Sequence, residues 1–97
     1  MQPESLYTKE ISQYFHSLAW PKGLKAQIVE RTSADELYLQ FIVFRDNFES
    51  FDGDDKRQIA MMVKEFMEKV RGLGVPIYME VAKGDGRAET TGVRVAN

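Results

Sequence analysis

Residues 37–45 read LYLQFIVFR and form the most strand-like stretch of the chain. Aromatic and β-branched residues, which favour extended backbone, fill most of its positions. Alternation places Leu37, Leu39, Phe41 and Val43 on one face and Tyr38, Ile42 and Phe44 on the other. Because both faces are apolar, the pattern predicts a central strand that is covered at least partly on both sides.

The residues before this strand predict a helix and a second strand. Residues 3–18 carry apolar side chains at helical spacing, at Tyr7, Ile11, Tyr14 and Leu18. Pro21 ends this helix, because a proline disfavours the α region for the residue before it. Residues 24–32 then alternate, with Leu24, Ala26 and Ile28 on the apolar face, which indicates a half-buried strand.

The residues after the central strand predict a loop, a helix and two strands. Residues 46–53 read as a loop, with Asp52 as N-cap of a helix over residues 54–71. Residues 75–82 alternate again, which predicts that Val75, Ile77, Met79 and Val81 point inward. Residues 83–86 have the composition of a hairpin turn, so residues 87–96 are expected to return as a weakly apolar strand.

This order predicts an α+β fold of one domain over residues 1–97. We expect a two-layer sandwich in the order α-β-β-α-β-β, with two helices on one face of a four-stranded, mainly antiparallel sheet. Such an arrangement buries one core in a chain of 97 residues. The expected core residues are Ile11, Phe15, Leu39, Phe41, Val63, Phe66, Ile77 and Met79.

Composition excludes several classes of function. The 13 Lys and Arg residues against 15 Asp and Glu residues give a net charge of -2, without the basic excess that duplex DNA binders carry. The absence of cysteine excludes disulfides, thiolate catalysis and sulfur-ligated metals, and it favours a cytoplasmic location. The longest apolar run is Ile59 to Val63, which is far shorter than a bilayer span, so no membrane span or signal peptide is expected.

Residues that could carry catalysis or bind a metal form no recognisable site. His16 is the single histidine, and it lies on the first helix without a predicted partner. The acidic residues between Asp46 and Asp55 do not fit the spacing of a calcium-binding loop. Gly84-Asp85-Gly86 lacks the following helix that a phosphate loop requires. We therefore predict no catalytic residue, no metal and no cofactor.

Two surfaces are candidates for partner binding. Phe48, Glu49 and Phe51 combine aromatic and acidic side chains in a loop longer than the usual length of about two to six residues. Tyr38, Ile42 and Phe44 lie on the sheet face away from the helices, where they would form an exposed apolar patch. Helix capping by the acids and folding of the loop over the core edge are the structural alternatives.

These features predict a small non-enzymatic protein-interaction module. Its partner would be another protein or a second copy in a homodimer, and its role that of an adaptor or inhibitor such as phages and mobile elements encode. The alternative is a single-stranded nucleic-acid-binding protein that stacks bases on the open sheet face, which the pI of about 5.4 disfavours. A third hypothesis is a small enzyme that assembles a site from His16 and the acidic loop across a subunit interface.

Overall fold

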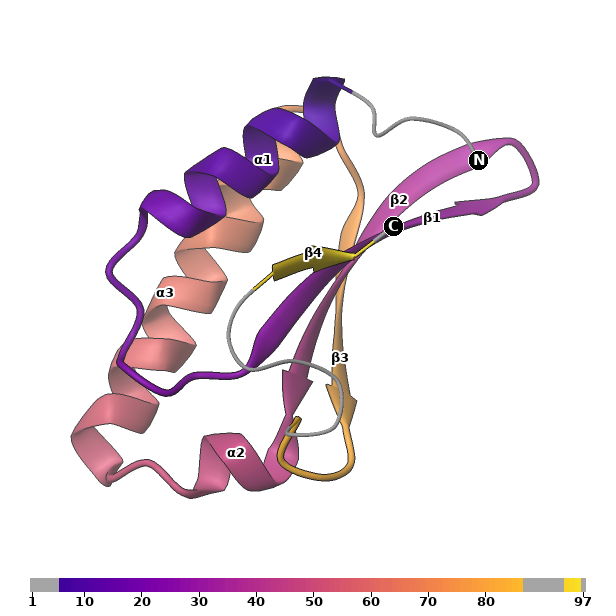
Figure 1. The fold of residues 1–97 in the computed structure, drawn as a ribbon. Helices are drawn as coiled ribbons and strands as arrows, with labels where there is room; N and C mark the ends of the chain where they lie inside the picture. Colours follow the sequence, from indigo (N-terminus) through magenta and orange to yellow (C-terminus); the bar gives the residue numbers. More distant parts are fainter. Residues whose placement is uncertain (1–5, 87–93, 97) are drawn as a thin grey trace.

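The computed structural model of this chain describes residues 6–86 and 94–96. Three helices and four strands follow one another as α1 (Leu6–Ser17), β1 (Ala26–Ser33), β2 (Glu36–Phe44), α2 (Arg45–Glu49), α3 (Gly53–Gly72), β3 (Ile77–Ala82) and β4 (Arg94–Ala96). The two long helices, α1 and α3, lie on the same side of the sheet (Figure 1). None of the helices among these residues combines the length and apolar composition that crossing a bilayer requires.

Strands β1 and β2 form the antiparallel centre of the sheet. They pair from Ala26 with Val43 at one end to Ser33 with Glu36 at the other. Ala34 and Asp35 connect them with φ angles of 49° and 70°, which is the left-handed backbone of a two-residue hairpin. The tip of this hairpin extends beyond the helical layer (Figure 1), so the side chains around it are exposed.

The sheet is mixed, so the prediction of a mainly antiparallel four-stranded sheet with two helices is wrong. Strand β3 pairs in parallel with β2, from Leu39 with Ile77 to Phe44 with Ala82. The chain passes from β2 to β3 through α2 and α3. This crossover returns the chain to the end of the sheet at which β2 begins, so β3 runs in the same direction as β2. Strands β1, β2 and β3 form the body of the sheet, and the three-residue β4 pairs in parallel with β1.

The last strand, β4, lies beside β1 and not beside β3 as expected. The sheet order is β3-β2-β1-β4, so β3 and β4 are not neighbours and do not form the predicted hairpin. The composition of residues 83–86 permits a reversal but does not specify which strand the chain joins next. Residues 87–93 of the predicted return strand lie outside the described residues.

The main core lies between the helices and the sheet. Phe15, Phe41 and Phe66 are fully buried at its centre, with ring centroids 5.4 to 5.6 Å apart in edge-to-face contacts. Trp20 packs on the same rings, and its indole N–H donates to the carbonyl of Phe15 at 2.8 Å. The predicted core is confirmed except at Met79, whose side chain is 51% exposed.

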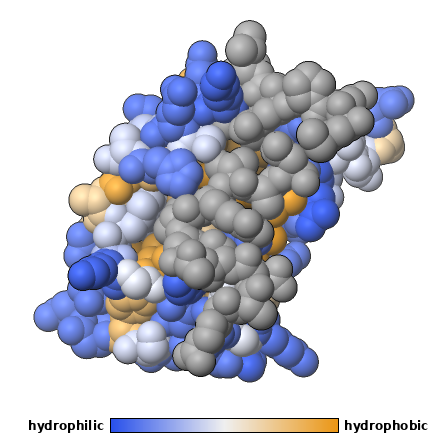
Figure 2. Space-filling model, in the orientation of Figure 1, coloured by the Kyte–Doolittle hydropathy of each residue, from blue (hydrophilic) through white to orange (hydrophobic). Residues whose placement is uncertain are grey.

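Helix α3 is capped at its N-terminus, and the helical layer turns a mostly hydrophilic surface to solvent. The carboxylate of Asp52 accepts a hydrogen bond from the backbone N–H of Asp55 at 2.8 Å, which confirms the predicted N-cap of α3. Figure 2 shows that hydrophilic side chains dominate the outer surface of the two long helices, with hydrophobic side chains in smaller areas. The apolar surface of interest lies instead between α3 and β3.

Candidate functional site

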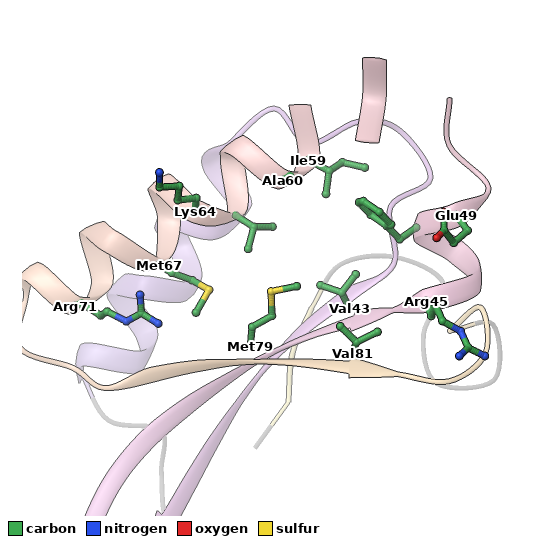
Figure 3. A pocket seen from close by; sticks show the side chains of 12 residues that line it. Val43, Arg45, Glu49, Ile59, Ala60, Lys64, Met67, Arg71, Met79 and Val81 are labelled. Atoms are coloured by element: carbon green, nitrogen blue, oxygen red, sulfur yellow. The ribbon is translucent and has the colours of Figure 1, made fainter. Parts of the chain in front are cut away.

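A groove of about 550 Å³ lies between α3 and the edge strand β3. Its volume falls within the range of about 300 to 1,000 Å³ that is common for ligand sites. Aliphatic, aromatic and thioether side chains form most of its lining, and charged groups lie around its rim (Figure 3). The lining residues are Val43, Arg45, Phe48, Glu49, Ile59, Ala60, Val63, Lys64, Met67, Arg71, Met79 and Val81.

The groove exists because α3 covers only the first part of β3. Ile77, Met79 and Val81 share one face of the strand, but their exposed fractions are 1%, 51% and 57%. Figure 3 shows α3 rising away from β3 between Arg71 and Ile59. Two apolar side chains of β3 are therefore directed at the helical layer without being buried by it.

The inner wall of the groove is the outer surface of the main core. Ile59, Val63 and Met67 of α3 are buried and belong to that core, as does Val43 of β2. Met67 and Met79 approach one another across the middle of the groove (Figure 3). Methionine side chains adapt their shape to what they contact, so this part of the wall suits a variable apolar ligand.

The rim of the groove is predominantly basic. Lys64 and Arg71 lie along α3, and Arg45 lies at the other end, where β2 meets α2. Glu49 is the single acid of the lining, and its carboxylate pairs with the ammonium group of Lys56 at 2.6 Å. Lys64 makes no ion pair with any residue that the structure describes.

The cations at the two ends of the groove differ in their contacts. The Arg71 guanidinium donates a hydrogen bond to the backbone carbonyl of Ile77 at 3.1 Å, which fixes it beside the start of β3. The Arg45 guanidinium lies 3.7 Å from the carboxylate of Asp46, and both side chains are more than half exposed. Each end of the groove thus presents a cation that an anionic group could approach from solvent.

The predicted loop of residues 46–53 is partly helical, because residues 45–49 form α2. Phe48 and Phe51 are half-buried and pack against the main core, and Phe48 also lines the groove. Glu49 lies on the rim of the same groove. Two of the three candidate residues from this segment therefore lie at the groove, and their role in partner binding stays a prediction.

The second candidate surface is largely covered within the chain. Ile42 and Phe44 are 7% and 5% exposed and form a small cluster with Val29 and Ala82. Gly86 lies so close to Phe44 that an added Cβ would be 2.7 Å from the ring. The expectation that Ile42 and Phe44 are exposed is wrong. Alternation assigns a side chain to one face of the sheet, but it does not show whether other residues cover that face.

Tyr38 keeps partial exposure on that second face. Its ring contacts the ring of Tyr78 edge-to-face, with centroids 5.8 Å apart. Beside the two rings, Gln40 accepts a hydrogen bond from Arg31 at 2.9 Å and donates one to Glu80 at 3.1 Å. A chain of polar side chains therefore lies beside the two tyrosine rings on this face.

The described residues offer little for catalysis. Histidine, aspartate and glutamate side chains do not gather in groups of three that could hold a metal ion anywhere in residues 9–86. His16 is exposed on α1, where its ring contacts Phe15, and it does not line the groove. The lining of the groove contains no hydroxyl, thiol or imidazole group.

The groove could not be identified from the sequence pattern. Alternation correctly places Met79 and Val81 on the face that points to the helices, but it carries no information on the angle at which a helix crosses a strand. Pro76, just before β3, was the only indication that this strand lies at an edge. Comparison of the chain with protein-family models, curated proteins and solved structures gave no match.

Proposed function

We propose that this protein is a small non-enzymatic interaction module that binds another protein through the groove between α3 and β3. The observation that carries the proposal is the half-exposed pair Met79 and Val81 above an apolar wall. Apolar side chains gathered in one depression at a sheet edge are typical of interaction sites rather than of ordinary surface. A partner that covers them would gain affinity from the burial of both side chains.

The chemistry of the lining favours binding over reaction. Its one carboxylate, Glu49, is held by Lys56, and the remaining polar groups are the cations Arg45, Lys64 and Arg71. Cations around an apolar centre provide orientation and selectivity at an interface. An adaptor or inhibitor function in the cytoplasm agrees with this chemistry and with the absence of cysteine.

A protein partner is favoured over single-stranded nucleic acid. Stacking of bases needs aromatic faces that are open to solvent, whereas Phe44 is buried and the Tyr38 ring meets that of Tyr78 edge-to-face. Binding to labelled oligonucleotides remains a useful outcome to measure, because it would contradict the proposal.

The test is affinity capture from the source cell with matched variants. Met79→Ser together with Val81→Ser should abolish capture of the partner, while the melting temperature stays close to that of the wild type. Met61→Ser is the control, because Met61 is 58% exposed on α3 but does not line the groove. Equal capture by all three chains, or a shift of oligonucleotides in place of a protein partner, would contradict the proposal.

A further inference from the structure

We infer that the partner enters the groove as an extended segment that adds to the sheet beside β3. This inference rests on the proposed function and specifies the form and charge of the partner. The segment directs two apolar side chains into the groove, with an acidic side chain before and after them on the same face. The backbone of β3, the direction of its side chains and the charges of the rim all favour such a segment.

The backbone of β3 has one edge that no other strand of the described residues occupies. The backbone N–H of Leu39 donates to the carbonyl of Pro76 at 2.9 Å, so Pro76 faces β2. Because backbone polar groups alternate in direction along a strand, Ile77, Met79 and Val81 direct theirs to the opposite edge. The hydrogen bond from Arg71 to the carbonyl of Ile77 agrees with this assignment.

Protection of this edge stops where the groove begins. Proteins usually protect an edge strand with proline, charge or a covering element. Here Pro76 and the Arg71 contact protect the start of the strand, whereas Met79 and Val81 present their N–H and C=O groups beyond it. These are the same two residues whose side chains line the groove. One added strand would therefore pair with their backbone and cover their side chains together.

The cations of the rim determine which charges the bound segment should carry. Arg71 lies beside the start of β3. Arg45 lies near the other end of β3, because it directly follows Phe44, which pairs with Ala82, the last residue of β3. Groove-facing positions of a strand recur every second residue, at intervals of about 6.6 Å. A segment that spans β3 can thus place acids near Arg71 and Arg45 and two apolar residues between them. Lys64, which also lines the groove, adds a third cation on α3.

A second copy of this chain fits the groove less well. Its β3 would contribute Met79 and Val81 on the groove side but no acid, since Glu80 lies on the other face with Gln40. The basic rims of both copies would also approach one another, and juxtaposed like charges disfavour association. Charge complementarity therefore selects a different protein with an acidic and apolar extended segment.

The probe is a blocked seven-residue peptide with glutamate at both ends, leucine and valine at the third and fifth positions, and threonine elsewhere. Calorimetry with the full chain should detect binding that weakens as salt increases. Replacing both glutamates with lysine should lower the affinity about tenfold. Lys64→Glu should lower the affinity for the glutamate peptide about three- to tenfold and raise that for the lysine peptide. Lys22→Glu, in an exposed turn outside the groove, should change neither affinity.

Two N-methylated peptides test strand addition itself. One carries the methyl groups on the leucine and valine amides, and the other carries them on the amides of the threonines that alternate with the groove-facing residues. Pairing with β3 requires one of these two sets, according to whether the segment runs antiparallel or parallel, so one peptide should lose binding and the other should retain it. Equal binding by both methylated peptides, or no binding by the parent peptide, overturns the inference.

The proposed function can fail separately from this inference. If Met79→Ser with Val81→Ser removes the natural partner but the peptides do not bind, the groove is a binding site for a differently shaped segment and the inference is wrong. If the groove variants change neither the capture of the partner nor the binding of the peptides, the proposed function and the inference are both wrong. Peptide binding that Met79→Ser and Val81→Ser leave unchanged overturns the inference, because the peptide then occupies another surface.

Discussion

Asn47 joins two parts of the chain that are far apart in sequence. Its Oδ1 accepts a hydrogen bond from the backbone N–H of Lys25 at 2.8 Å, and its Nδ2 donates to the carbonyl of Gly23 at 3.0 Å. These bonds tie α2 to the turn before β1. They also help to position Phe48, the next residue, which lines the groove.

Removal of this side chain should therefore destabilise the fold. We expect Asn47→Ala to lower the free energy of unfolding by about 1 to 3 kcal/mol, because it leaves a partly buried N–H without its acceptor. Asn47→Asp keeps the acceptor for Lys25 and should lose less. Urea denaturation measures both changes, and an Asn47→Ala midpoint equal to that of the wild type would show that α2 is held by other contacts.

Phe66 and Met79 both occupy inward positions of their elements, yet only Phe66 is buried. Phe66→Ala should lower the free energy of unfolding by about 3 to 5 kcal/mol, since it removes a ring from the aromatic centre and leaves a cavity. Met79→Ala should cost about 0.5 kcal/mol or less, as for other surface positions. Denaturant melts of the two variants give the comparison, and a similar loss in both would show that the groove is closed in solution.

Helix α2 illustrates how much a local pattern can predict. The acids and the two phenylalanines of residues 46–53 suggested a loop, and the short helix was missed because five residues give too little helical periodicity to detect. The Asp52 cap of α3 was predictable, because it depends on residues only three positions apart. Contact between α2 and the turn before β1 was not, because Asn47 and Gly23 are 24 positions apart.

Phe48 in α2 and Phe51 just after it test whether this part of the chain belongs to the core or serves in partner binding. Phe48 and Phe51 pack against the main core while half-buried. Phe48→Ser together with Phe51→Ser should therefore cost several kcal/mol of stability, more than the cost of about 1 kcal/mol expected for the cap variant Asp52→Ala. An unchanged melting temperature in the double variant, with Asp52→Ala destabilised, would instead assign the two rings to partner binding.

The topology of the whole molecule could be predicted only in part. Apolar alternation and helical spacing located the long helices, the three main strands and almost all of the core, since these depend on neighbouring residues. Strand direction and strand order depend on where each connection passes, and residues 83–86 do not encode that path. The groove is a consequence of the same global geometry, because it arises where α3 leaves β3 (Figure 3).

The proposals for the groove require that the outer edge of β3 is open in the isolated chain. Amide hydrogen exchange, followed residue by residue by NMR, tests this requirement most directly. Tyr78 and Glu80 direct their N–H groups to β2 and should be protected, whereas the N–H groups of Met79 and Val81 should exchange at least tenfold faster. Equal protection of all four amides, at concentrations where the chain sediments as a monomer, would show that the chain itself already covers this edge and would contradict the account.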